Sequence, residues 1–266
     1  MRNVLLAVVA MFALLWCAPI VQAVQSDDWL GLERVNDGIV TIRYDVNADV
    51  KTKLMIAKEQ TKYTYRLPPD KREQSFPLQM GNGDYTISVL EQVGGTKYKV
   101  VREATVKLEL AQAEDVYLNS VQNVEWSETS RAVQIAKELT KTSATDSEKV
   151  QAVYEYVIGT IRYDDALASS DLADYIPDID RTIAEGKDIC YGYASLFAAM
   201  LRSVDIPAKL VMGTSEYVEA YHAWNEVYLN GAWVTVDTTV DAGWKGSGTA
   251  FEMVKDAGRY AAVKYY

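Results

Sequence analysis

Histidine, cysteine and proline are scarce in this sequence. Its 266 residues include one histidine, two cysteines and six prolines. So few cysteines exclude a disulfide-stapled scaffold, and one histidine leaves too few soft ligands for a zinc site. The 15 glycines are equally far from a collagen-like or low-complexity composition. With 49% hydrophobic residues at this length, we expect a packed globular protein of one or two domains.

Long apolar runs are absent after the N-terminal region. The apolar run at 4–18 is shorter than the stretch of about 20 residues that a membrane span needs. Small residues follow it at 21 and 23, three residues and one residue before a possible cleavage site. We therefore predict a signal peptide over 1–23 and an exported protein, secreted or in the cell envelope, which meets the membrane only through that signal. Lipid attachment at Cys17 is the less favoured alternative, because bulky Trp16 stands where lipoprotein signals have a small residue.

Basic residues are fewer than acidic residues in this chain. The chain has 27 lysines and arginines against 37 aspartates and glutamates, a net charge of −10, and loss of 1–23 removes one arginine and no acidic residue, which makes it −11. This acidity argues against nucleic acid as a partner. The same cut leaves Cys190 as the only cysteine, so its thiol is either buried and inert or retained for its reactivity.

The hydrophobic period changes along the chain. From 38 to 110, apolar and polar residues alternate between turn sequences, which predicts an immunoglobulin-like β-sandwich domain over 24–112. A polar linker over 113–126 follows, and helical spacing then begins the C-terminal domain, 127–266. The expected fold class is α+β. For the sandwich, the sequence indicates no chemistry beyond a docking or spacer role.

Three helices are expected in the C-terminal domain. Ser127 is a predicted N-cap for the first, and the second begins with the capping box at 145–148 and is expected to end at Gly159. Apolar residues recur at three- and four-residue spacing from 193 to 204. This places Cys190 at or just before the first turn of a mostly buried helix.

The position of Cys190 matters chemically. Free backbone N–H groups and the positive end of the helix dipole converge at a first turn, where they favour a thiolate and can donate to an oxyanion. Taken alone, however, a cysteine is more often an inert buried residue than a nucleophile.

A predicted hairpin strengthens the chemical interpretation. Asn230–Gly231 separates two alternating runs, 221–229 and 232–239, which is the strongest short-range hairpin signal. In that register His222 lies one diagonal step from Asp237, about 7–8 Å at the backbone, which the side chains can bridge. The only histidine, the only cysteine left after export and a strand-paired aspartate thus supply a base, a nucleophile and an orienting group.

Several motifs of the second half are similar to those of the transglutaminase-like superfamily, in its bacterial secreted branch. They are Asp180-Arg181-Thr182, Lys187 to Ala194, Met200 to Gly213, His222 to Leu229 and Trp233 to Thr238. The resemblance implies a papain-like fold, in which a helix carrying the cysteine packs on an antiparallel sheet. It also implies Cys190 as nucleophile, His222 as base and Asp237 as orienter.

Two positions differ from the pattern of many relatives. Those relatives have glycine before the Ile-Cys pair and aspartate two residues after the cysteine, whereas this chain has Asp188 and Gly192. We expect the Asp188 charge to oppose ionisation of the nearby thiol.

The resemblance implies thiol-dependent acyl transfer or hydrolysis on protein or peptide amides. Proteins of the cell envelope are among the substrates that this activity allows. Two alternatives stay open: a cysteine peptidase or amidase with the same triad, and a catalytically silent envelope binding module. Trp224 shares a strand face with His222 and is predicted to contact substrate, as is Tyr191 beside the cysteine.

No cofactor is expected. The acidic stretch 164–180 invites a calcium site because some members of this superfamily use calcium, but it lacks the ligand spacing of a dedicated loop. No metal site is predicted.

Overall fold

The computed structural model describes residues 28–266. The predicted signal peptide and the alternative lipid site at Cys17 lie outside the described residues. Within 28–266, no helix has the length and apolar character needed to cross a membrane.

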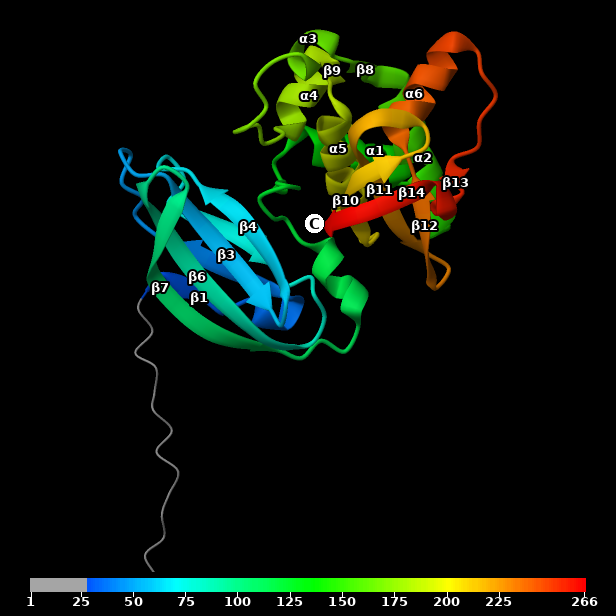
Figure 1. Cartoon of the computed structure of the whole chain (residues 1–266). Helices are drawn as coiled ribbons and strands as arrows, with labels where there is room; N and C mark the ends of the chain where they lie inside the picture. The colour runs from blue at the N-terminus through cyan, green and yellow to red at the C-terminus, as the bar shows by residue number, and fades with distance from the viewer. Residues whose placement is uncertain (1–27) are drawn as a thin grey trace, which may run out of the picture.

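The N-terminal part consists of two packed antiparallel sheets (Figure 1). One sheet has the order β1-β2-β5, formed by β1 (Leu30–Gly31), β2 (Ile39–Arg43) and β5 (Glu73–Pro77). The other has the order β4-β3-β6-β7, formed by β3 (Thr52–Lys58), β4 (Thr61–Leu67), β6 (Gly83–Gly94) and β7 (Lys97–Leu108). The alternating apolar side chains Tyr85, Ile87 and Val89 of β6 are fully buried, as the pattern predicted, whereas in β2 Ile39 and Val40 are both buried.

The C-terminal part combines helices with a five-stranded antiparallel sheet of order β13-β12-β11-β10-β14. Its strands are β10 (Ala208–Ser215), β11 (Val218–Leu229), β12 (Ala232–Val236), β13 (Val254–Lys255) and β14 (Tyr260–Tyr265). Its helices are α1 (Arg131–Thr140), α2 (Asp146–Thr160), α3 (Asp165–Ala168), α4 (Ile179–Glu185), α5 (Cys190–Arg202) and α6 (Thr238–Ser247). A short parallel pair, β8 (Arg162–Tyr163) and β9 (Lys187–Asp188), precedes α5. Helix α5 is central, since it contacts β10 and β11 as well as α1, α2 and α4. The predicted α+β class is confirmed.

Helix α2 begins as the sequence predicts. The Thr145 side chain accepts a hydrogen bond from the Glu148 N–H, and the Glu148 carboxylate accepts one from the Thr145 N–H, which completes the capping box. The predicted end at Gly159 is wrong, because α2 continues through Thr160.

The predicted cap of α1 is also wrong. The helix begins at Arg131, after Ser130, and Ser127 lies outside it. The carboxylate of Asp180, in α4, accepts hydrogen bonds from the N–H groups of Arg131 and Ala132 at 3.1 and 3.0 Å. A residue far along the chain therefore supplies the cap, and no local pattern can reveal that.

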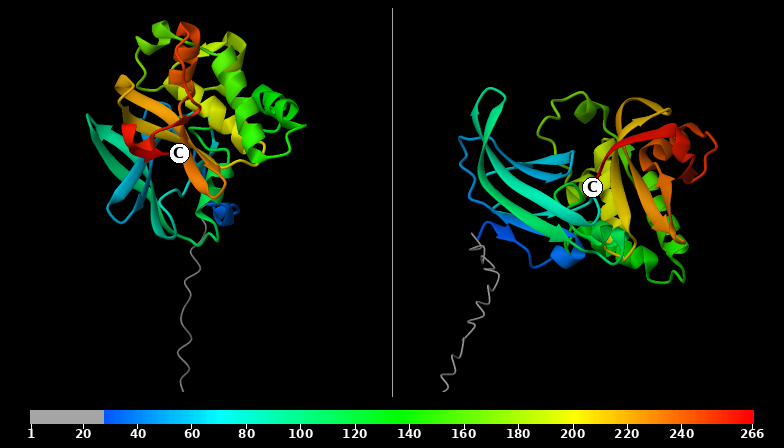
Figure 2. Two further views of the ribbon diagram at one scale, coloured as in Figure 1. Left: turned by 90° about the vertical axis from the view of Figure 1, so that its right-hand side faces the viewer. Right: turned by 60° about the horizontal axis from the view of Figure 1, so that its bottom comes forward.

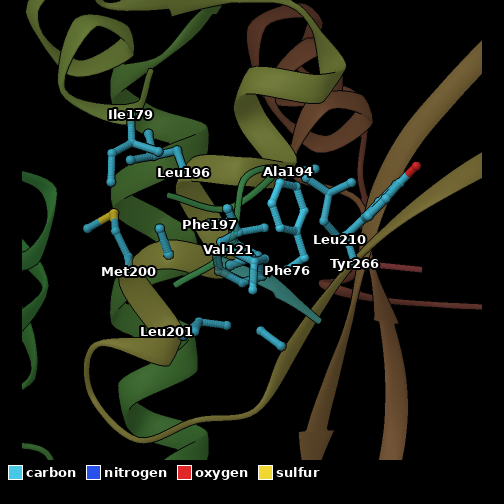
Figure 3. Close-up of a cluster of buried hydrophobic side chains, with 14 of the residues drawn as sticks. Phe76, Val121, Ile179, Ala194, Leu196, Phe197, Met200, Leu201, Leu210 and Tyr266 are labelled. Atoms are coloured by element: carbon cyan, nitrogen blue, oxygen red, sulfur yellow. The ribbon is translucent and has the colours of Figure 1, made fainter. Parts of the chain in front are cut away.

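One hydrophobic core joins the two parts. Figure 3 shows Phe76 of β5 and Val121 packed with side chains of α5 and with Tyr266. The C-terminus lies between the sandwich and the sheet in both figures that show the whole chain (Figures 1 and 2). There the Tyr266 ring meets Tyr63 and Tyr65 edge-on, with centroids 5.8 and 5.9 Å apart.

The segment 113–126, predicted as a polar linker, is largely packed. It contains the 3₁₀ helix η2 (Ala113–Leu118) and buries four of its apolar side chains, Val116, Tyr117, Val121 and Val124. The two parts therefore share a continuous interior through this segment.

Candidate active site

The β11–β12 hairpin carries His222 and leads to Asp237. Asn230 and Gly231 have φ values of 52° and 81°, as a two-residue type I′ turn requires. The strand pairs have the register that the turn predicts. Pairing ends one residue before Asp237, which leaves the sheet and caps α6 by accepting a hydrogen bond from the Val240 N–H at 3.1 Å.

Asp237 holds the histidine ring through a short hydrogen bond. His222 Nε2 lies 2.8 Å from Asp237 Oδ2, and the two residues are 2% and 0% exposed. The Tyr260 hydroxyl, in β14, donates to the same carboxylate oxygen at 3.0 Å. With the Val240 N–H on the other oxygen, three donors fix the orientation of this carboxylate. Sequence reasoning missed Tyr260, which has no motif around it.

Cys190 is the first residue of α5 and is half-buried. Its thiol neighbours the His222 ring and raises the pKa of that ring. Because Asp237 occupies Nε2, Nδ1 is the ring nitrogen that is left for a proton exchange with the thiol. Among residues 28–266, none accepts a hydrogen bond from the Cys190 N–H, so this group is available to an oxyanion.

The surroundings of His222 favour its protonated form. Burial of the ring opposes protonation, but the hydrogen bonds and charges of Asp237 and Cys190 outweigh it and raise the pKa of His222 to about 9. At neutral pH the ring therefore carries a proton that it can give to a leaving group.

Trp224 packs behind the histidine. It is 1% exposed, and its ring stacks on His222 with centroids 6.2 Å apart. The Trp224 ring also contacts the Tyr260 ring in a tilted arrangement, with centroids 5.0 Å apart. Such burial leaves no indole surface for a substrate, so the prediction that Trp224 contacts substrate does not fit this geometry. Its contacts instead fix the imidazole and the Tyr260 ring.

A second buried carboxylate lies one turn after Asp237. Asp241 is fully buried, pairs with Lys255 at 2.5 Å and accepts a hydrogen bond from the Tyr154 hydroxyl at 2.8 Å. Burial raises the pKa of Asp241, while Lys255 and Tyr154 oppose that effect. The ammonium group thus compensates a negative charge that would otherwise act on Asp237.

Two further polar residues near the site, Tyr191 and Glu226, have internal partners. The Tyr191 hydroxyl accepts a hydrogen bond from Asn123 at 2.7 Å, and its ring meets Tyr175 edge-on at 6.0 Å. Glu226, which shares the His222 strand face, pairs with Lys209 at 2.6 Å. The substrate contact predicted for Tyr191 stays a prediction, since these contacts engage its hydroxyl and one ring edge.

Half of the six acidic residues in 164–180 cap helices, one of them being Asp180, described above. Asp164 caps α3 and pairs with Lys187 at 2.9 Å, and Asp178 caps α4. Asp174 pairs with Arg66 at 2.8 Å. Within the described part of the chain, no group of three or more His, Cys, Asp or Glu side chains is arranged to hold a metal ion.

The chain is similar to known proteins in both sequence and structure. Residues 133–238 match the family model of the transglutaminase-like superfamily core. Human kyphoscoliosis peptidase is 30% identical over 190 residues, which cover 67% of this chain and 27% of that protein. The mouse protein of the same name is 34% identical over 122 residues, 41% of this chain and 18% of that protein. The chain therefore spans about a quarter or less of the length of these curated relatives.

Among solved structures, a candidate cysteine protease from Cytophaga hutchinsonii superposes with a TM-score of 0.47 at 14% identity, covering 86% of this chain and 75% of that one. The periplasmic domain of TgpA from Pseudomonas aeruginosa gives 0.37 at 15% identity, covering 80% and 93%. The matched segment 133–238 includes the start of α5, the hairpin and Asp237. Residues 133–238 of this chain are therefore a transglutaminase-like core domain.

Proposed function

We propose that this protein is an exported cysteine enzyme that acts on protein or peptide amides through a thioester on Cys190. The buried His222–Asp237 hydrogen bond supports this proposal, together with the Cys190 thiol that raises the pKa of the same ring. These three groups come from a helix start, a strand and a helix cap, and their contact needs the whole C-terminal fold.

Each step uses a group already in place. Cys190 Sγ attacks the amide carbonyl carbon, and the Cys190 N–H donates to the resulting oxyanion. The C–N bond breaks as His222 gives its proton to the departing amine or ammonia. A second amine or water then attacks the thioester carbonyl and gives a proton to His222, and the C–S bond breaks to release the Cys190 thiolate. Attack by the amine forms a cross-link, and attack by water completes hydrolysis. Asp237 and Tyr260 keep the ring oriented throughout.

Hydrolysis of peptide bonds is the second candidate function. The name of the human relative, a peptidase, favours it. Mass spectrometry of the products separates the candidates, because a peptidase leaves shortened peptides while a transferase joins an amine to an intact one.

The test is incubation of the mature protein with a glutamine-containing peptide, with and without a primary amine. We expect ammonia release and a mass change that disappear in Cys190→Ala. Val100→Ala, an exposed substitution on β7, is the matched control and retains activity. A binding module without catalysis is the conclusion if a thiol-reactive amide probe labels Cys190 no faster than it labels the denatured protein.

Export rests on the predicted signal peptide alone. Expression of the full chain in a bacterial host, followed by mass measurement of the exported protein, is expected to show a mature N-terminus at Val24. A full-length cytoplasmic product would contradict export while leaving the proposed chemistry intact.

A further inference from the structure

Asp188 is a buried carboxylate that the proposed reaction leaves unexplained. It is 0% exposed and lies two residues before Cys190, at the end of β9. Four donors surround it: the Tyr175 hydroxyl, the Thr182 hydroxyl at 2.6 Å, the Arg181 guanidinium at 3.4 Å and the Ile189 N–H at 2.7 Å. A carboxylate with this many donors is held in one orientation.

These contacts tie the start of α5 to its neighbours. Ile189 is the N-cap residue of α5, so the Asp188 carboxylate fixes the Asp188–Ile189 peptide group, one residue before Cys190. Arg181 and Thr182 connect the same carboxylate to α4. The Arg181 charge also compensates that of Asp188, and this pairing counters the repulsion of the thiolate expected from the sequence.

Gly192 leaves the space that the carboxylate fills. A Cβ atom at this position would lie 2.0 Å from Asp188 Cγ and 2.3 and 2.4 Å from its two oxygens. A side chain at 192 and the Asp188 carboxylate therefore exclude each other from one volume. The two departures from the superfamily pattern noted above, at 188 and 192, are thus a single structural feature.

We propose that Asp188 is the positioning residue of the nucleophile, and that the start of α5 needs one carboxylate in this volume, which position 188 or position 192 can supply. This inference rests on the proposed function. It assigns Asp188 no contact with substrate, because the carboxylate acts through the backbone that carries Cys190.

The experiment compares wild type with Asp188→Gly, Gly192→Asp and the double exchange Asp188→Gly/Gly192→Asp. Each protein is measured for kcat and KM of ammonia release, for the alkylation rate of Cys190 at pH 7 and for its thermal melt. Since displacement of a reacting group by about 1 Å costs about 100-fold in rate, we expect Asp188→Gly to lose about 10- to 100-fold in kcat with KM changed by less than about 2-fold. Gly192→Asp alone places two carboxylates in one volume and is expected to be inactive.

The double exchange is the decisive protein. We expect its kcat to lie within about 5-fold of wild type, because the carboxylate returns to the same volume from position 192. This recovery is expected even if Asp188→Gly folds poorly. Asp188→Asn keeps the volume and one acceptor oxygen, and its kcat is expected to lie between wild type and Asp188→Gly.

The two proposals fail in different ways. A wild-type protein that releases no ammonia and alkylates no faster than its denatured form refutes the proposed function. If wild type is active and Asp188→Gly is equally active, the role proposed for Asp188 is refuted. It is also refuted if the double exchange is as inactive as Asp188→Gly. Equal losses in Asp188→Asn and Asp188→Gly would also count against it.

Discussion

Protonation of His222 can be followed directly, because it is the only histidine of the chain. Its pKa in the folded protein is raised from 6.5 to about 9. At about 1.4 kcal/mol per unit of pKa, this difference favours the protonated ring by about 3 kcal/mol. The ring is 2% exposed, so solvent screening reduces this value little.

The assay is proton NMR of the ring Cε1–H across pH 5 to 11. We expect one titrating resonance with a midpoint near 9 in the native protein and near 6.5 in urea. Asp237→Asn and Cys190→Ala each remove a group that raises the pKa, so both lower the midpoint. The larger decrease in pKa is expected in Asp237→Asn, because the hydrogen bond from Asp237 is the largest of the effects that raise the His222 pKa.

The same titration predicts how stability changes with pH. In Cys190→Ala, where no thiol shares the proton, a folded pKa above 6.5 makes the imidazolium a stabilising group. Its contribution is complete below pH 6.5 and is lost as the pH rises through the folded midpoint. Urea unfolding at pH 6 and pH 10 measures this loss, with Cys190→Ala/His222→Gln as control. A native wild-type midpoint at or below 6.5 would refute the interpretation of the site.

Three further substitutions test residues that hold Asp237, Asp241 and helix α2 in place. Tyr260→Phe removes a donor to Asp237 and is expected to lower kcat about 10-fold with an unchanged thermal melt; an unchanged kcat contradicts its orienting role. Lys255→Met leaves Asp241 buried without its cation and should cost about 3–5 kcal/mol in urea unfolding, largely restored by also changing Asp241 to Leu. Thr145→Ala removes a helix cap and should cost about 1 kcal/mol at unchanged kcat, so a lower kcat would show that α2 is coupled to the site.

Features set by neighbouring residues were predictable from the sequence. The Asn230–Gly231 turn fixed the strand register, because a type I′ turn of two residues needs positive φ at both of them, which Asn and Gly adopt readily. The capping box at 145–148 and the place of Cys190 at the first turn of α5 are similarly local. The side chains that complete these elements were less predictable, as Asp180 shows by capping α1 from α4.

The amino-acid order alone determined the composition of the site, since a chain with one histidine and one cysteine after position 23 offers no other pair. The tertiary structure decided what surrounds them: Tyr260 on the carboxylate, Trp224 behind the ring and Asp188 in the space above Gly192. Hydrogen bonds and steric exclusion act over a few ångströms, whatever the separation along the chain. Partners that meet only when helices and strands pack therefore leave no periodic signal in the sequence.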